Sequence, residues 1–147
     1  MKTLNTVLKV GLGALGLAGL FIPTLGHAAE ESPGDVTGLI TRGEASYQSY
    51  CASCHGPDGE GEGILTEYLT VKPSDLTAIA PGLDGEFPFD RIYQVIDGRG
   101  VPVHGGREMP VWGPAFMGMD ETHDKKAVKE KIVELVYYLK SIQSPAE

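Results

Sequence analysis

Cysteine is nearly absent from this chain of 147 residues, in which Cys51 and Cys54 are the only two. An exported domain stabilised by disulfides usually contains more cysteines at wider spacing, so that class of protein is disfavoured. A structural disulfide between these two residues would also close a very short, strained loop. Because His55 follows the pair directly, the arrangement indicates a different chemistry.

Basic residues are also scarce: 12 Lys and Arg stand against 20 Asp and Glu, which gives a formal net charge of −8. This acidic balance argues against binding to nucleic acid or to anionic membrane surfaces. It suits a soluble protein that meets basic partners, although solubility alone explains the charge equally well.

A hydrophobic run long enough to span a membrane is lacking as well. The uncharged stretch 10–26 has 17 residues and is broken by Pro23, whereas a spanning helix needs about 20 apolar residues. Two lysines precede the stretch and small residues follow it, which is typical of a secretory signal peptide. We therefore expect a signal peptide over residues 1–28, cleaved after Ala28 to give a periplasmic protein. A retained membrane anchor is the alternative.

Cleavage at this point leaves 119 residues with 10 basic and 20 acidic side chains, a formal charge of −10 before any cofactor is counted. Residues 29–35 are polar and contain Pro and Gly, so we expect a flexible arm there. Residues 36–147 are then expected to form one folded domain.

No window of the sequence shows sustained alternation of apolar and polar residues, which predicts an all-α domain with long loops. Three main helices are expected, over residues 37–50, over 88–97, and through the apolar residues of 128–142 that recur at helical spacing. Residues 99–120 are rich in Gly and Pro and are expected to form an extended loop. The apolar helix faces are small for the chain length, so a buried planar cofactor would complete the core.

Several caps and short turns are also predicted. Asp124 or Thr122 is expected to cap the last helix, and Gly98 to end the middle one. A short helical turn is expected over residues 64–69, and a second brief helix capped by Ser74.

The sequence Cys51-Ala52-Ser53-Cys54-His55 is the attachment motif for c-type haem. Two thiols one helical turn apart can reach two vinyl groups on one porphyrin edge and form thioethers there. The adjacent histidine then lies under the iron as the proximal ligand. A thioredoxin-like pair would need a βαβ setting, which is not indicated here. A zinc site would need further ligands, and His104 and His123 lack a zinc-finger spacing.

The iron needs a sixth ligand or an open site, and methionine and histidine are the candidates. We expect Met109, in the sequence Gly-Gly-Arg-Glu-Met-Pro, to be this ligand, because His/Met ligation gives an electron-transfer iron. Met117 and Met119 remain alternatives, although they could instead fill gaps in the core. His104 is interpreted as a surface loop residue.

On these motifs the chain resembles the class I monohaem cytochromes c of bacteria, across roughly residues 37–143. The similarity includes a glycine, an aromatic residue and the first haem cysteine at successive spacings of four, and it ends in a closing helix. The matching residues are Gly43, Tyr47, Cys51, Met109-Pro110 and Leu135-Val136-Tyr137-Tyr138-Leu139-Lys140.

The resemblance implies a class I cytochrome c fold with one covalent haem c and its iron. It implies that the first and last helices cross at Gly43, with Tyr138 packed at the crossing. It also implies that a proline carbonyl, for which Pro73 is the candidate, accepts a hydrogen bond from the second nitrogen of His55. Haem propionates could be bound by Trp112, Arg99 and Arg107.

The resulting functional hypothesis is a soluble periplasmic carrier that transfers one electron and catalyses no reaction on a substrate. Its partners would be redox proteins, not nucleic acid, and it would not be inserted in a membrane after signal cleavage. The alternative is an electron-accepting cytochrome c subunit of a dehydrogenase or oxidase complex. A peroxidase or gas sensor is a third hypothesis, which requires an open sixth position on the iron.

Overall fold

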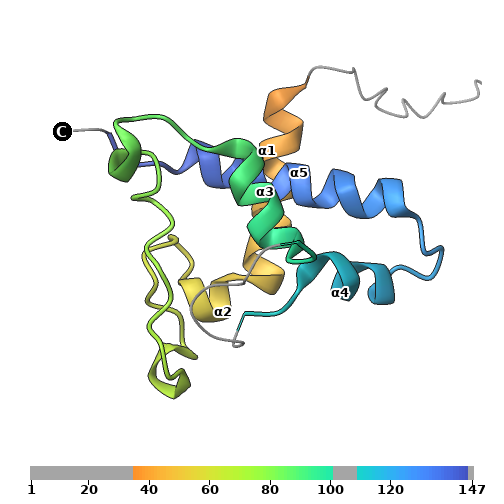
Figure 1. Cartoon of the computed structure of the whole chain (residues 1–147), viewed down its shortest axis with the longest axis horizontal. Coiled ribbons are helices and arrows are strands. Elements are labelled where there is room, and N and C mark those ends of the chain that lie inside the picture. The colour runs from red at the N-terminus through yellow and green to blue at the C-terminus, as the bar shows by residue number, and fades with distance from the viewer. Residues whose placement is uncertain (1–34, 101–108, 146–147) are drawn as a thin grey trace, which may run out of the picture. The chain divides into compact units, whose positions relative to one another are not determined.

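The computed structural model describes residues 35–100 and 109–145, all within one compact unit of residues 32–147. These ranges contain helices and no strands, which confirms the predicted all-α class (Figure 1). The helices are α1 (Val36–Tyr50), α2 (Ala52–His55), α3 (Phe89–Asp97), α4 (Trp112–Met119) and α5 (Lys125–Ser141), with 3-10 turns η1 (Thr66–Tyr68) and η2 (Pro81–Leu83). None of the helices in the described ranges is long and apolar enough to cross a membrane. The expected signal peptide and the residues His104 and Arg107 lie outside the described residues.

Helices α1 and α5 cross at Gly43, as the resemblance implied (Figure 1). A Cβ atom at Gly43 would overlap the backbone carbonyl of Glu134, so the two backbones meet without a side chain between them. The ring of Tyr47, one turn further along α1, packs 5.1 Å from the ring of Tyr138. Beside the crossing, Arg42 pairs with the carboxylate of Glu134.

Helix α5 supplies most of the buried core, on the face that its sequence period predicted. The buried side chains on this face are Val128, Ile132, Leu135, Val136, Tyr138 and Leu139. The side chain of Asp124 accepts a hydrogen bond from the backbone N–H of Lys126 at 2.8 Å, so Asp124 is the cap. Thr122 instead donates its own N–H to Asp120. The helix is thus fixed both by its cap and by its apolar face.

Helix α4 overturns the prediction of an extended loop over residues 99–120. Pro114 lies in the first turn of this helix, where an N–H has no intrahelical partner to lose. Gly113 lies so close to Asp97 that a Cβ atom would overlap the carboxylate. Trp112 and Phe116, one turn apart, are both buried with ring centroids 5.1 Å apart. Burial of these two aromatic rings therefore outweighs the local preference of Gly and Pro for a loop.

The smaller elements follow the sequence predictions with two differences: the brief helix predicted after residue 74 forms only as a turn, and the residue that caps this turn is not the predicted one. The turn predicted over residues 64–69 forms as η1, and Gly98 ends α3 in the left-handed conformation at φ 73°. The turn after residue 74 is capped by Asp75, whose carboxylate accepts the N–H of Thr77 at 2.8 Å. The prediction of Ser74 as this cap was wrong, because the carboxylate one residue later reaches the same N–H.

Candidate cofactor site

The short helix α2 carries the two cysteines and the histidine, and it continues directly from α1. The backbone N–H of Cys51 still bonds to Tyr47 at 2.8 Å, and the N–H of His55 bonds to Cys51 at 2.9 Å. Both cysteines are free thiols and half-buried. They therefore lie one helical turn apart, with His55 one residue after Cys54, which is the spacing that the haem motif requires.

The loop after α2 folds back and satisfies the carbonyl groups at the end of this helix. The N–H groups of Gly61, Gly63 and Leu65 donate to the carbonyls of His55, Cys54 and Ser53, at 2.8, 3.2 and 2.9 Å. A Cβ atom at residue 63 would overlap the Ser53 carbonyl, so the close return of the chain requires glycine there. The repeated glycines of this segment thus build a tight backbone cradle beneath the motif.

Two side chains anchor this cradle. The buried hydroxyl of Tyr47 donates to the carbonyl of Gly56 at 2.7 Å. The hydroxyl of Thr66 lies 3.0 Å from the carbonyl of Cys54 and 3.2 Å from that of Gly61, so it ties η1 to α2. Both anchors use carbonyl groups at or next to the motif, and they hold the histidine end of α2 in place.

The imidazole of His55 is oriented by a backbone carbonyl, although not by the predicted one. Its Nδ1 atom lies 3.3 Å from the carbonyl oxygen of Ser74. The carbonyl of Pro73 is turned toward Gly61, where it occupies the place of a side chain. The structure thus gives the predicted role of Pro73 to the next residue. When Nδ1 carries the proton for this bond, Nε2 keeps its lone pair for a metal.

A cavity of about 300 Å³ opens beside the motif and is lined by Cys51, Cys54, His55 and Met109. A smaller cavity of about 60 Å³ shares three of these residues and extends toward Leu135 in the core. The walls common to both are mainly apolar and include Trp112. A planar, apolar group held by two thiols and two axial ligands fits this donor set and these walls.

The structure separates Met109 from the other two candidate methionines. Among the described residues that line the two cavities, Met109 is the one methionine. Met117 packs half-buried against the core, and Met119 is 58% exposed at the end of α4. The histidine candidate His123 lies in an exposed loop, with its ring nitrogen 3.2 Å from the Glu121 carbonyl.

The structure bears on two of the three alternative interpretations of the cysteine pair, a redox-active pair and a zinc site. Burial, and secondarily the neighbouring Cys54, raise the pKa of Cys51 to about 12. A redox-active pair needs the opposite, a thiol with a lowered pKa. Over residues 35–100 and 109–145, no three or more His, Cys, Asp or Glu side chains group as a metal site would need. A zinc site therefore gains no support in this part of the chain.

The predicted propionate contacts receive mixed support. Trp112 lines both cavities. The guanidinium of Arg99 is instead paired with the carboxylate of Asp97, with nitrogen to oxygen distances of 2.7 and 2.9 Å. This pairing lowers the pKa of Asp97. Sequence reasoning missed Tyr50 and Val71, which complete the cavity wall; the position of Tyr50 next to Cys51 was the one available signal.

A comparison with protein families gives a match that covers residues 38–139, more than two-thirds of the chain. The matching family is described as cytochrome c oxidase, cbb3-type, subunit III. No curated protein and no solved structure matches the chain. The matched range contains the cysteine motif, Ser74 and Met109.

Proposed function

The chain belongs to the family of cytochrome c domains described as cytochrome c oxidase, cbb3-type, subunit III, and we propose that it is a soluble periplasmic electron carrier with His/Met axial ligation. As a cytochrome c domain it carries covalently bound haem c, and its role is electron transfer rather than catalysis. The haem supplies the one-electron couple between ferric and ferrous iron. The protein supplies attachment, ligation and burial.

The residues of the cavity take distinct roles in this proposal. Cys51 and Cys54 hold the haem through two thioethers, and His55 is the proximal ligand through Nε2. The Ser74 carbonyl accepts a hydrogen bond from the Nδ1–H group of His55, which fixes the ring and makes the imidazole a stronger ligand. Met109 supplies a thioether sulfur as the sixth ligand, which raises the reduction potential.

The observation that carries this assignment is that Met109 lines the same cavity as the motif, although 54 residues separate it from His55. A redox titration of the purified holoprotein tests the proposal. We expect a reversible one-electron couple and, in the ferric state, the charge-transfer absorption band of methionine-ligated haem. A high-spin ferric spectrum would contradict the methionine ligand, and the absence of a reversible couple would contradict the carrier.

The family description also favours a second candidate function, an electron-accepting subunit of a larger redox complex, because the family is named for an oxidase subunit. The two candidates differ in how the native protein is assembled. Size-exclusion chromatography of the protein from its native source distinguishes them, since a carrier elutes as a monomer and a subunit elutes at a far larger size.

The proposal also includes export of the chain, directed by its N-terminal segment. We propose that residues 1–28 are a signal peptide cleaved after Ala28, that residues 29–35 form a flexible arm, and that residues 36–147 are the haem domain. The uncharged run and the small residues around position 28 support this division. The intact mass of the periplasmic protein tests it: a chain that begins at residue 29 supports the cleavage, and a full-length membrane-bound chain contradicts it.

A further inference from the structure

An exposed apolar patch borders the cofactor cavity. Its members are Ile64, Leu65, Tyr68 and Val71, and they are 81%, 41%, 76% and 53% exposed. Val71 also lines the cavity wall together with Leu69, so the patch begins where the cavity opens. Contiguous exposed apolar side chains on a soluble protein mark interaction surfaces, since water contact with them is unfavourable.

Acidic residues flank the patch along the chain. Asp58, Glu60, Glu62 and Glu67 are all exposed, and residues 56–71 contain no Lys or Arg. The first basic residue beyond this range, Lys72, is paired with Glu62 at 3.0 Å. We call the four carboxylates and the apolar patch together the 58–71 surface.

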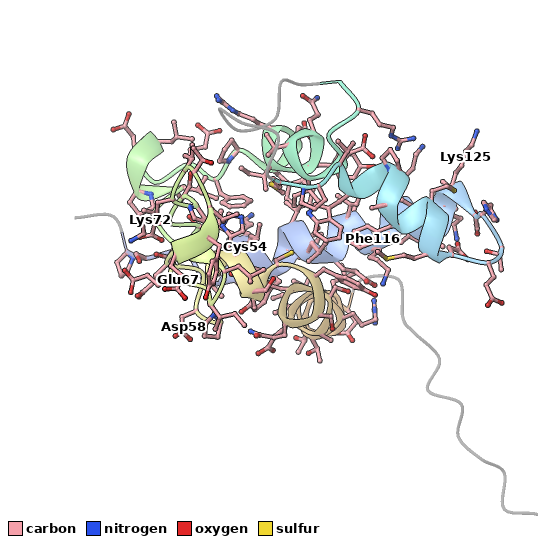
Figure 2. All side chains as sticks on the ribbon, turned by 90° about the horizontal axis from the view of Figure 1, so that it is seen from below. Cys54, Asp58, Glu67, Lys72, Phe116 and Lys125 are labelled. Carbon is pink, nitrogen blue, oxygen red and sulfur yellow. The ribbon has the colours of Figure 1, made fainter. Side chains whose placement is uncertain are left out.

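The opposite end of the domain carries mixed charge, because the lysines that begin α5 follow directly after Asp120, Glu121 and Asp124, and Lys126 is paired with Glu130. Helix α5 contains five lysines and two glutamates, and three of the lysines lie within its first five residues. Figure 2 shows Asp58, Glu67 and Lys72 toward one end of the molecule, with Cys54 inward of them, and Lys125 at the other end. The uninterrupted run of acidic residues over 58–67 is therefore a local feature of the end near Cys54, and it favours a positively charged partner surface there.

We propose that the 58–71 surface docks a redox protein that presents basic side chains around a small apolar contact. The acidic residues steer the encounter, and the apolar patch provides the contact that excludes water between the two cofactors. This inference rests on the proposed function, because it names the partner class for the same cofactor site. A second copy of this chain is not a suitable partner, since pairing would bring the acidic residues of two 58–71 surfaces together.

Electron-exchange kinetics test the electrostatic part. The probe is a purified monohaem cytochrome of strongly basic isoelectric point, mixed with the holoprotein in a stopped-flow instrument. We expect the second-order rate constant to fall as salt increases. The double variant Glu60→Lys/Glu67→Lys should be slower than wild type by about tenfold or more at low salt. The control Glu86→Lys/Glu121→Lys makes the same net charge change elsewhere and should stay within about threefold of wild type.

A second pair of variants tests the apolar part. Ile64→Ser/Tyr68→Ser should weaken the complex at every salt concentration, because the lost contact is not electrostatic. Met119→Ser removes a comparably exposed side chain from α4 and should leave the complex unchanged. Both parts of the proposal are overturned if each variant behaves like its control.

Two further measurements separate this proposal from the carrier function. NMR chemical-shift changes on titration with the same basic cytochrome report docking without any electron transfer, and they should include the amides of residues 58–71. The reduction potential of every variant should equal that of wild type. A normal one-electron redox couple without preferential chemical-shift changes at residues 58–71 would contradict the docking surface alone. A missing redox couple with these chemical-shift changes present would contradict the carrier function alone.

Discussion

Gly43 of α1 lies directly against the backbone carbonyl of Glu134 in α5, where the two helices cross. Because a Cβ atom cannot fit between them, Gly43→Ala must push the helices apart or distort the carbonyl. We expect a loss of about 3 kcal/mol in the free energy of unfolding, at the upper end of the usual cost of overpacking. Chemical denaturation of the holoprotein measures it.

Gly118 provides the matched control for this prediction. It also lies in a helix, α4, but a Cβ atom there would meet open space. Gly118→Ala should therefore stabilise the protein slightly or leave it unchanged, by at most about 1 kcal/mol. Equal destabilisation by the two alanines would contradict the close approach at Gly43.

The buried hydroxyl of Tyr47 donates to the Gly56 carbonyl, and Tyr47→Phe removes that bond. We expect a loss of roughly 1–2 kcal/mol at neutral pH, because the carbonyl is left without this donor. Urea denaturation measures the loss. The exposed Tyr68, changed to Phe in the same way, should have no effect on unfolding.

The same tyrosine predicts a loss of stability in alkali. Burial raises the pKa of Tyr47 above its ordinary value of 10.0. Above that pH the unfolded chain releases the Tyr47 proton while the folded chain keeps it, so stability falls as pH rises. We expect a decline of up to about 1.4 kcal/mol per pH unit from this group, beginning near pH 10. Tyr47→Phe should make the decline shallower, and an unchanged slope would contradict the prediction.

Met109→Ala tests the sixth ligand. Without the thioether, the ferric charge-transfer band should disappear and the reduction potential should fall by roughly 0.1 V or more, within the range of about 0.8 V that axial ligands span. Met117→Ala removes a half-buried methionine that lines neither cavity and should preserve both the band and the potential. Loss of the band in the Met117 variant instead would reassign the ligand.

Thr66 is predicted to act on the iron indirectly, through the loop that carries the Ser74 carbonyl. Its hydroxyl donates to the backbone carbonyls of Cys54 and Gly61. Gly61 in turn packs against the carbonyl of Pro73, the residue before Ser74. Thr66→Val should loosen this contact and weaken the hydrogen bond from His55, which makes the histidine a poorer donor to ferric iron. We expect the reduction potential to rise by some tens of millivolts. For a one-electron couple, a shift of about 59 mV corresponds to a tenfold change in the equilibrium constant.

Thr66→Ser restores the hydroxyl and should return the potential to its wild-type value. A purely structural role for Thr66 predicts a lower melting temperature in the valine variant with no change in potential. The potential and the melting temperature, measured on the same samples, therefore distinguish the two roles.

The sequence predicted best where the signal was periodic or local. The apolar period of α5 and the cap at Asp124 depend on residues close in the chain, and both are confirmed. The helix α4 was missed because its two aromatic residues stabilise it through contacts with distant elements. One such contact is that of Trp112 with Tyr50, whose rings lie 5.8 Å apart.

Two details of the site could not be read from the sequence. The carbonyl that faces His55 belongs to Ser74, because the close packing of Gly61 turns the Pro73 carbonyl elsewhere. Arg99 is paired with Asp97, two residues away, although its charge made it a candidate for a propionate. In both cases the direction of a group depends on how a loop folds.

The sequence by itself determined the chemistry: Cys51, Cys54 and His55 form a haem-attachment motif whose geometry is set within one helical turn. Only the tertiary structure decided what surrounds that motif. It brings Met109 to the cavity and sets Ser74 behind the histidine. It also places Val71, at one end of the 58–71 surface, in the wall of the cavity. These relationships join segments that are far apart in the chain, and packing of α1 against α5 and closure of the glycine-rich loop create them.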